Sequence, residues 1–374
     1  MSRAAQVRVR QPDLPLSQGE EWTKAESVQP KEFTSRAPAT IRRIVGDARS
    51  IPLPNASVDL VVTSPPYWRK RDYGLAGQIG QEATLEQYVE SIIKALREWR
   101  RLWRRTGSVF LNIGDTYWKR SLASIPARIE VAASEDGWRI RNCIIWAKKG
   151  GMPDPARDRL ASRHEYIFHL TPNPCYYYDL FGYARTIGNG ANPGDVWHFE
   201  PGRSMNGHLA PFPEELVRRA ILLACPEAVC SSCNEPRTRI VKRTAELDLS
   251  RPQARRALEI AEKYNLTPDH IRAIQATGVS DAGKALIVQN GTGRNAACVK
   301  ELAAEAKCIL RGYFREFTFA RRETVDWTSC RCKQRFVPGT VLDPFMGSGT
   351  TLVVAQQMGR SAIGVDIVDP NLSG

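Results

Sequence analysis

The sequence predicts an α/β protein built on a doubly wound, mostly parallel sheet. Apolar, β-branched runs alternate with helix-like segments over residues 41–223 and again from residue 341 onwards, as in a parallel sheet with helices on both faces. Two loops, at residues 63–68 and 343–350, each follow such a run directly. Because open α/β sheets bind ligands at the carboxyl ends of their strands, both loops are candidate binding sites.

The individual elements follow from the period of the apolar residues. Short apolar runs predict strands at residues 41–45, 58–63, 108–113, 138–146, 164–170 and 362–365. Apolar positions at helical spacing predict helices at residues 85–103, 125–135, 213–223 and 350–358. Gly107 is expected to end the first helix, and Pro213 to lie in the first turn of the third.

The composition indicates a polyanionic partner. The chain of 374 residues has a net charge of +13, and nucleic acid is the commonest polyanion that such a protein meets. A basic surface kept for solubility is the alternative. No apolar run approaches the roughly 18 residues of a membrane span, and the start lacks a secretory signal, so we expect a cytoplasmic protein with no membrane partner.

The alternation of strands and helices is interrupted once. We predict an N-terminal arm at residues 1–38, an α/β domain at residues 39–227 and 337–374, and a mainly helical insert at residues 228–336. Residues 235–335 hold 20 Lys and Arg against 12 Asp and Glu, so the insert carries +8 of the chain's +13.

The loop at residues 343–350 has the composition of a nucleotide-cofactor site. Gly347 and Gly349 allow the backbone to approach a ligand closely, and Thr350 begins a helix whose first N–H groups are free. Asp366, at the end of the following strand, suits the hydroxyl groups of a ribose. The alternative is a tight strand–helix turn that binds nothing.

The loop at residues 63–68 suits a flat base with an exocyclic amino group. Pro65 and Pro66 lack N–H donors and fix φ, so they form a rigid loop with outward-facing carbonyl groups. The Ser64 hydroxyl and the Pro65 carbonyl are acceptors for an amino group, and Tyr67 offers a face for stacking. The alternative is a proline-stiffened turn with an aromatic core residue.

Together the two loops resemble the signature of S-adenosylmethionine-dependent DNA amino-methyltransferases, which methylate N4 of cytosine or N6 of adenine. Their order along the chain resembles the β, circularly permuted, arrangement of that family. The resemblance covers roughly residues 40–226 and 337–366, and it implies a seven-stranded Rossmann-like methyltransferase sheet. Further segments typical of the family lie at residues 46–47, 71–74, 77–80, 112–115, 136–138, 145–148, 164–165 and 208–213.

The resemblance implies a role for each site residue. The methionine end of S-adenosylmethionine would be lined by Asp343, Phe345, Gly347 and Gly349, with Thr350 starting the adjoining helix. Asp366 would hold the ribose and Asp47 would lie near the adenine, while Phe212 and Pro213 would close the pocket. A base flipped out of double-stranded DNA would be held by Ser64, Pro65, Pro66 and Tyr67.

The sequence favours cytosine N4 as the methylated atom. Serine stands at the head of the substrate loop in this chain, whereas the adenine enzymes more often have Asp or Asn there; adenine N6 stays open. A non-catalytic DNA-binding subunit is disfavoured by the intact loops, and action on RNA or on protein glutamine by the basic insert. A cytosine-C5 enzyme would need a thiolate nucleophile, but Cys175 lies outside the substrate loop and we interpret it as structural.

The resemblance also bears on partners. It implies site-specific action within a restriction–modification system, with a cognate restriction endonuclease as a possible companion and the chain acting as a monomer or a dimer. Family members continue after the strand corresponding to the one that ends at Asp366 into a helix that packs on the sheet. This chain ends eight residues later, at Gly374, so we expect the N-terminal arm or a partner to cover that face.

Two cysteine pairs flank the insert. Four thiolates without a histidine suit a closed, structural Zn²⁺ site, and the ligands would be Cys230, Cys233, Cys330 and Cys332. Two chance pairs of free cysteines are the alternative, and Cys225 is a competing ligand. Cys298 and Cys308 follow a helical pattern and are expected in the core.

The insert is expected to contribute to target recognition. Its residues 258–274 predict two short helices, the second with Thr267 as N-cap and Pro268 in its first turn. Arg251, Arg255 and Arg256 are candidates for phosphate contacts, which would position the insert while other side chains read base edges. The alternative is a solvated decoration that only stabilises the fold.

Overall fold

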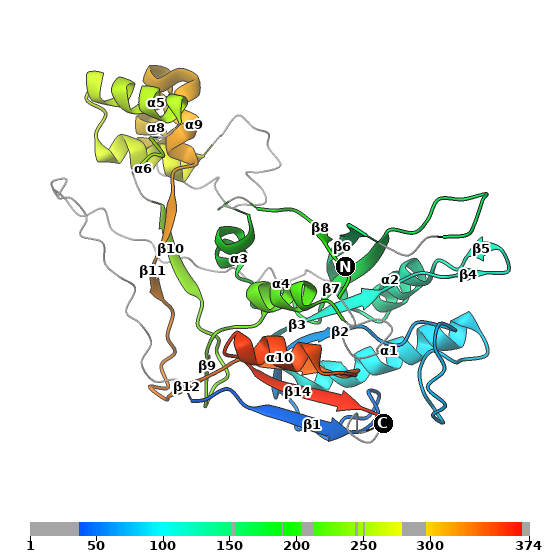
Figure 1. Ribbon diagram of the computed structural model, residues 1–374. Coiled ribbons are helices and arrows are strands. Elements are labelled where there is room, and N and C mark those ends of the chain that lie inside the picture. The colour runs from blue at the N-terminus through cyan, green and yellow to red at the C-terminus, as the bar shows by residue number, and fades with distance from the viewer. Residues whose placement is uncertain are drawn as a thin grey trace, which may run out of the picture.

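The computed structural model describes residues 37–368, except for residues 151–153, 189, 191, 203–211, 244–245, 250 and 279–296. Within these residues, eight strands form one central sheet (Figure 1). Their order across the sheet is β1 (Ile41–Val45), β14 (Ser361–Asp366), β13 (Thr340–Asp343), β2 (Val58–Thr63), β3 (Trp103–Ile113), β7 (His164–Thr171), β6 (Arg139–Lys148) and β8 (Val196–Phe199). β7 is antiparallel to both neighbours, and every other pair is parallel. The sheet is thus mostly parallel, as predicted, with eight strands where seven were expected.

Helices cover both faces of the sheet, which confirms the doubly wound prediction. On one face, Val61 packs into a core with α1 (Leu85–Leu102) and α2 (Ile125–Glu135). Its neighbours Leu60 and Val62 point to the other face, against α3 (Leu180–Ile187), α4 (Glu214–Ala224) and α10 (Thr350–Gln357). Because successive side chains of a strand point to opposite faces of the sheet, an unbroken apolar run contributes side chains to both cores.

The C-terminal strands lie between the two N-terminal strands of the sheet, β1 and β2. β13 pairs with β2, and β14 lies between β13 and β1. The two predicted loops are therefore carried by neighbouring strands. That this order is a circular permutation stays a prediction.

The role predicted for Gly107 is wrong, although the first helix, predicted at residues 85–103, ends within one residue of that prediction. Gly107 does not end the first helix: α1 ends at Leu102, Trp103 already begins β3, and Gly107 lies within that strand. The buried Trp103 pairs with Val58 and packs edge-on against Trp138 at 5.0 Å. This packing ends the helix before the glycine, and a Cβ at Gly107 would lie 2.9 Å from the Trp103 ring.

The cysteine-flanked insert is connected to the sheet by two neighbouring segments of the chain. β9 (Val229–Cys230) pairs with β12 (Phe336–Val337), and beyond them β10 (Arg239–Arg243) and β11 (Arg322–Trp327) form an antiparallel ribbon. The ribbon leads to a separate helical group (Figure 1). The group consists of α5 (Pro252–Lys263), α6 (Pro268–Thr277), α8 (Ala297–Leu310), a 3-10 turn (Arg311–Tyr313) and α9 (Phe314–Thr318). A mainly helical insert was predicted, and its two helices predicted at residues 258–274 correspond to α5 and α6. The ribbon was not predicted.

The helical group has a small core of its own. Ile271, Ile274, Leu310 and Phe317 are its larger buried side chains, and Thr267 caps α6 as predicted. Cys298 and Cys308 were expected in the core but are exposed, because α8 instead buries its face of Ala303, Ala306 and Leu310.

Some predictions fall on residues that the structure does not describe. They include the arm up to residue 36, residues 208–211 of a family motif, and the expected cover of the sheet beyond Asp366. In the described part of the chain, no helix is long and apolar enough to cross a membrane.

Candidate active site

The two predicted loops lie side by side at the carboxyl ends of β2 and β13. Asp343, the last residue of β13, is 2% exposed. Its carboxyl group accepts hydrogen bonds from Thr63 Oγ1 and from Thr351 Oγ1, both at 2.6 Å. One buried carboxyl group thus joins the end of β2, where the substrate loop begins, to the first turn of α10.

Asp343 is engaged inside the protein. It also accepts a hydrogen bond from the Phe345 backbone N–H at 3.1 Å, and burial raises its pKa to about 6. The sequence placed Asp343 beside the methionine end of a cofactor. The side chain also braces the loop through these hydrogen bonds, and its place at the methionine end of the cofactor stays a prediction.

The cofactor loop turns sharply at its glycines. Gly347 and Gly349 have φ values of +47° and +84°, and Gly349 is the N-cap of α10. Such angles disfavour any residue with a Cβ. The loop also packs closely on β14, because a Cβ at Gly364 would lie 2.4 Å from the Met346 sulfur. Gly364 is a requirement of this loop that the sequence alone did not reveal.

The remaining cofactor-loop residues lie as follows. Phe345 packs edge-on against Trp99 of α1 at 6.2 Å. Thr350 is the first residue of α10, and its hydroxyl lies 3.4 Å from the Ser348 hydroxyl. The first turn of α10 therefore faces the end of the sheet that carries the loops, and free N–H groups there favour a ligand with negative charge or oxygen acceptors.

Two predicted carboxyl groups end the neighbouring strands β14 and β1. Asp366 Oδ2 accepts a hydrogen bond from the Gly347 N–H at 2.9 Å. The Gly46 N–H donates to the Asp366 carbonyl at 2.8 Å, which places Asp47 next along this edge. Arg49 binds both Asp47 oxygens, at 2.9 and 2.7 Å, and this contact lowers the pKa of the Asp47 carboxyl.

Phe212 and Pro213 stand at the start of α4. Pro213 is buried and is the N-cap of the helix, and Phe212 is half-buried against the core on that face. The same core contains Met346 of the cofactor loop. Both residues therefore belong to the layer beside the cofactor loop.

The substrate loop is held from two sides. The Tyr88 hydroxyl of α1 donates to the Pro66 carbonyl at 3.0 Å, so this carbonyl faces inward instead of outward as predicted. On the other side the Tyr67 ring lies against Gly114, where a Cβ would be 2.6 Å from Tyr67 Cε2. Within the described residues no hydrogen bond reaches the Pro65 carbonyl.

A polar network that the sequence did not predict fixes Tyr67 and Ser64. The Tyr67 hydroxyl donates to Glu165 Oε2 at 2.5 Å. Asn112 Nδ2 donates to the Tyr67 oxygen at 2.9 Å and to Glu165 Oε2 at 2.7 Å, and it lies 3.4 Å from Ser64 Oγ. Lys148 Nζ pairs with the other Glu165 oxygen at 2.5 Å.

This network keeps Tyr67 protonated. Burial, followed by the neighbouring Glu165 carboxyl, raises the pKa of Tyr67 well above its usual value. Tyr67 is therefore a fixed hydrogen-bond donor to Glu165 across the physiological pH range. Glu165 and Lys148 lie in segments typical of the family that the sequence resembles. Their ion pair depends on the antiparallel register of β6 and β7, which sets Trp146 opposite Glu165.

The four predicted zinc ligands are brought together. The sulfur atoms of Cys230, Cys233, Cys330 and Cys332 all lie within 4.8 Å of one another. Sulfur atoms about 2.3 Å from a tetrahedral Zn²⁺ would be about 3.8 Å apart, so the donor set fits the ion. Each pair is followed by a residue with positive φ, Asn234 at 58° and Lys333 at 53°.

The other cysteines lie outside this cluster. Cys225 is buried, with its sulfur 3.9 Å from the Pro226 carbonyl, and burial raises the pKa of its thiol. Cys225 does not compete as a ligand in this arrangement. Cys175 is exposed in the segment after β7, where it does not belong to the substrate loop.

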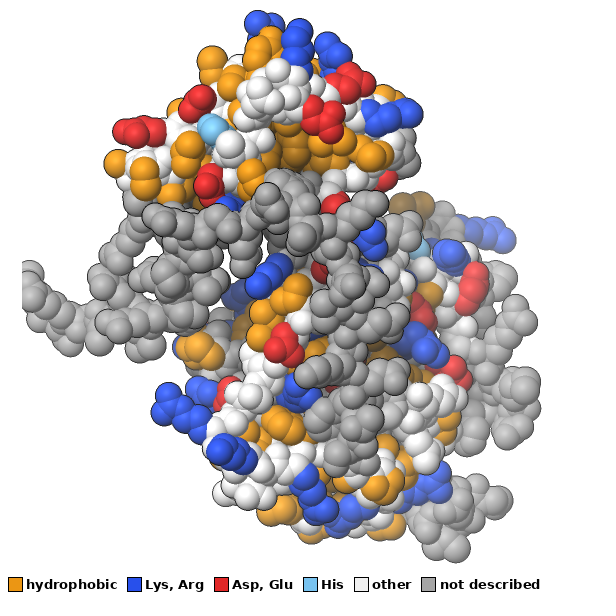
Figure 2. All heavy atoms as spheres, turned by 90° about the vertical axis from the view of Figure 1, so that its left-hand side faces the viewer, with side chains coloured by type: hydrophobic (Ala, Val, Ile, Leu, Met, Phe, Trp, Pro, Cys, Tyr) orange, Lys and Arg blue, Asp and Glu red, His pale blue; other side chains and the backbone are white. Residues whose placement is uncertain are grey.

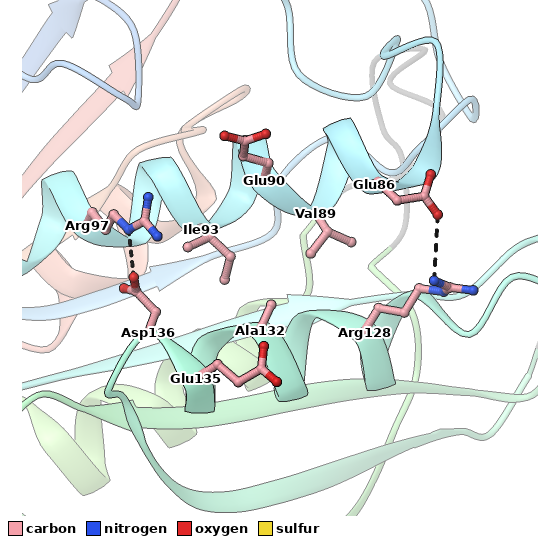
Figure 3. A pocket seen from close by; sticks show the side chains of 9 residues that line it. All are labelled: Glu86, Val89, Glu90, Ile93, Arg97, Arg128, Ala132, Glu135 and Asp136. Carbon is pink, nitrogen blue, oxygen red and sulfur yellow. Dashed lines mark hydrogen bonds and ion pairs between the residues drawn. The ribbon is translucent and has the colours of Figure 1, made fainter.

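A pocket of about 490 Å³ lies between α1 and α2 (Figure 3). It is bordered by the ion pairs Arg97–Asp136 at 2.7 Å and Glu86–Arg128 at 3.7 Å. No residue of the two strand-end loops lines it. This pocket is therefore separate from the candidate active site.

Comparison with known proteins decides the family. The profile of the DNA methylase family, whose name joins N6 and N4 enzymes, matches residues 58–229 and 336–370. These stretches make up more than half of the chain and contain both loops. The chain is an N6/N4 DNA methylase. It is thus an S-adenosylmethionine-dependent DNA methyltransferase, and the residues between the two matched stretches coincide with its cysteine-flanked insert.

The DNA methylase also resembles individual proteins. It is 34% identical over 210 residues to the type II methyltransferase M.Cfr9I of Citrobacter freundii, a match that covers 47% of this chain and 70% of that protein. It is 34% identical over 214 residues to M.SmaI of Serratia marcescens, covering 48% and 73%. A match to M.SfiI of Streptomyces fimbriatus is 41% identical over 145 residues and covers 34% of each chain.

A solved structure supports the fold of this DNA methylase. The PvuII DNA methyltransferase, described as cytosine-N4-specific, superposes with a TM-score of 0.50 and 14% identity, covering 89% of this chain and 85% of that one. At this identity the likeness concerns the fold alone.

Proposed function

We propose that this DNA methylase transfers a methyl group to N4 of cytosine at a specific site in double-stranded DNA. The observation that carries the proposal is the joining of the Ser64 loop to the cofactor loop through the Thr63–Asp343–Thr351 hydrogen bonds. Serine at the head of the substrate loop favours cytosine. A pyrimidine flipped onto this loop would place its amino group near the Ser64 hydroxyl.

The cofactor side of the site would hold S-adenosylmethionine with few side chains. Gly347 and Gly349 would let the loop backbone approach the ligand, and Thr350 would present the first turn of α10. Asp366 would accept a hydrogen bond from a ribose hydroxyl. Asp47, which also pairs with Arg49, would lie toward the adenine. Phe345, Phe212 and Pro213 would supply apolar walls, and S-adenosylmethionine, when bound, supplies an electrophilic methyl group.

The protein's contribution to the reaction would be placement. Ser64 Oγ and the Pro65 carbonyl would accept hydrogen bonds from the amino group, which raises electron density on its nitrogen and orients its lone pair. As the carbon–sulfur bond of the cofactor breaks and the new nitrogen–carbon bond forms, the same acceptors would help the surplus amino proton leave. Tyr67 would stack on the base, with its ring fixed by Gly114 and its hydroxyl by Glu165. An amino nitrogen held in line with a methyl donor and away from water needs no nucleophile from the protein.

We further propose that the four clustered cysteines bind one structural Zn²⁺. They lie where the two segments of the insert leave the sheet: Cys230 ends β9, Cys233 lies between β9 and β10, and Cys330 and Cys332 lie between β11 and β12. A metal there would fix the base of the ribbon, because the few residues at this point have little apolar surface to bury. The α/β parts at residues 39–227 and 337–374 would then form the catalytic domain.

The insert is proposed to recognise the target sequence. Its positive charge is not spread evenly: residues 235–243 and 322–335 hold 8 Lys and Arg against 3 Asp and Glu, whereas residues 244–321 hold 12 against 9. In the helical group, Arg251 pairs with Glu316 and Arg256 with Glu259, and Figure 2 shows charges of both signs among hydrophobic side chains there. The ribbon and its base would therefore contact phosphates, and the helical group would read the sequence.

The proposal is tested by product analysis. The purified protein is incubated with S-adenosylmethionine and unmethylated DNA, and the DNA is digested to nucleosides for mass spectrometry. N4-methylcytosine is expected. N6-methyladenine would establish the alternative base, and the absence of either product would favour a non-catalytic DNA-binding subunit. Sequencing of the methylated sites would identify the target, which a cognate restriction endonuclease would share.

A further inference from the structure

A short hairpin follows the carboxyl end of β3, at the same end of the sheet as the substrate loop. β4 (Tyr117–Trp118) and β5 (Ser121–Leu122) pair antiparallel immediately after β3 (Figure 1). The Asp115 carboxyl accepts from the N–H groups of Thr116 at 2.8 Å and Ile125 at 3.1 Å. The hairpin is therefore held at its base, and no sequence pattern predicted it.

The turn of this hairpin has an unusual composition. Its two residues, Lys119 and Arg120, have φ values of 48° and 65°. A two-residue turn with both residues in the left-handed region normally takes Asn-Gly, since Gly has no Cβ and Asn tolerates positive φ better than long side chains do. Two long cationic side chains at the least suitable positions indicate a role other than hairpin stability.

The hairpin is free to meet a partner. All six of its residues are exposed, with Trp118 at 42% and Leu122 at 46%. In the part of the chain that the structure describes, neither Lys119 nor Arg120 forms a hydrogen bond or an ion pair. Two uncompensated cations therefore stand at the tip, above exposed aromatic surface.

Aromatic contacts fix the hairpin relative to the substrate loop. Trp118 packs edge-on against Trp68 at 5.4 Å, and Trp68 directly follows Tyr67 in that loop. The Arg69 guanidinium lies 4.5 Å from the centre of the Trp118 ring. On the other side, Arg159 covers Tyr117 at 3.8 Å. The cationic tip thus has a set position beside the site where the base is expected.

We propose that Lys119 and Arg120 clamp DNA phosphates that flank the flipped base. An enzyme that turns a base out of a duplex must hold the neighbouring backbone, and paired cations on a rigid turn suit phosphate oxygens. The partner is DNA, the substrate class of the family. The clamp does not depend on which base is methylated.

The double variant Lys119→Asn/Arg120→Gly tests the proposal. It removes both charges and supplies the residues that this turn favours, so its Tm should equal or exceed that of the native chain. Binding to a duplex lacking the target site is measured by fluorescence anisotropy from 50 to 200 mM salt. The slope of log affinity against log salt should become less steep by about 1.8, and the affinity at low salt should fall about tenfold.

The control variant Lys119→Arg/Arg120→Lys keeps both charges and both strained positions. Its affinity should stay within about twofold of the native value, with the same salt slope. Native affinity and slope in the Asn-Gly variant would overturn the clamp, and so would an equal loss in both variants, since charge would then not matter. The assay measures binding without turnover, so failure of the cytosine N4 proposal would leave this result intact.

Discussion

At the scale of single residues, Glu165 uses both of its carboxylate oxygens to hold other residues of the site. One of its oxygens accepts from Tyr67 and Asn112, and the other pairs with Lys148. Glu165 therefore links the substrate loop to β3 and β6. Since Tyr67 directly follows the two prolines, its placement also fixes the end of the rigid loop.

We predict that Glu165→Gln lowers kcat about 10- to 100-fold, because loss of the carboxylate loosens Tyr67 and displacements of about 1 Å have effects of this size. Affinity for S-adenosylmethionine, measured by calorimetry, should stay unchanged, since within the described residues Glu165 bonds to Tyr67, Asn112 and Lys148 on the substrate side. The variant Glu165→Asp, which keeps the charge, should recover part of the rate. A native kcat in Glu165→Gln would show that the network only stabilises the fold.

His169 is a buried residue of β7 whose protonation is expected to change the free energy of unfolding. It stacks on Phe110 at 4.6 Å and on Tyr178 at 5.3 Å. Neither of its ring nitrogens has a hydrogen-bond partner within the described residues. Burial, with a smaller contribution from Arg141, lowers its pKa to about 3, so the folded state holds the neutral ring.

We predict that His169 destabilises the protein as the pH falls. The unfolded chain protonates this residue near pH 6.5 and the folded chain only near pH 3, so stability is lost below pH 6.5 at about 1.4 kcal/mol per pH unit. Urea unfolding at pH 7.5 and pH 5 measures the loss. His169→Phe should lose about 2 kcal/mol less than the native chain.

The control for His169 is His164→Gln, at an exposed position on the same strand. It should show the native pH dependence. An identical pH dependence in the native chain and in His169→Phe would contradict the assignment.

At the scale of elements, the insert is attached by few contacts. Arg239 of β10 pairs with Asp179, the N-cap of α3, at 2.6 Å and stacks on Trp327 of β11 at 4.4 Å. Nearer the sheet, β9 and β12 contribute two residues each. A metal bound by the four cysteines would thus be a principal support of the ribbon.

We predict about one Zn²⁺ per chain by elemental analysis, because the ion needs four ligands and the described cluster has four. Cys233→Ser should reduce the metal content below about one tenth of an ion per chain and make the ribbon sensitive to limited proteolysis. Cys308→Ser, at an exposed cysteine in α8, should keep the native metal content. Metal-free native protein with a protease-resistant ribbon would rule out the site.

At the scale of the whole molecule, the chain divides chemistry and recognition between regions. The strand-end loops lie on the sheet, and the helical group extends from it on the ribbon (Figure 1). Arg243 and Arg322 are paired at the outer end of that ribbon. The helical group can therefore be removed there without cutting the cysteine cluster.

We predict that replacing residues 244–321 by Asn-Gly, which closes the ribbon as a hairpin, relaxes the choice of target sequence. Sequencing of methylated sites should show a discrimination between target and non-target DNA at least about tenfold weaker, the effect of losing roughly one base-reading contact. Binding of S-adenosylmethionine serves as the folding control. Unchanged sequence choice and unchanged DNA affinity would make the helical group a structural decoration.

The predictability of the fold varied with the range of the interactions. The limits of β1, β2 and α2 follow from local apolar patterns and agree with the structure. The first helix was predicted at residues 85–103 and ends at Leu102, but its predicted terminator, Gly107, lies inside β3, because Trp103 packs against Trp138, a residue distant in sequence. The ribbon of β10 and β11 was not predicted, since each strand is stabilised by a partner strand about 80 residues away in the sequence.

The sequence by itself determined the reaction class, both strand-end loops and the four clustered cysteines, because residue type and local spacing carry that chemistry. Only the tertiary structure decided which groups meet. Asp343 faces Thr63 and Thr351, Glu165 reaches Tyr67, and the Lys119–Arg120 turn stands beside the substrate loop. These contacts depend on strand order and register, which no local pattern encodes.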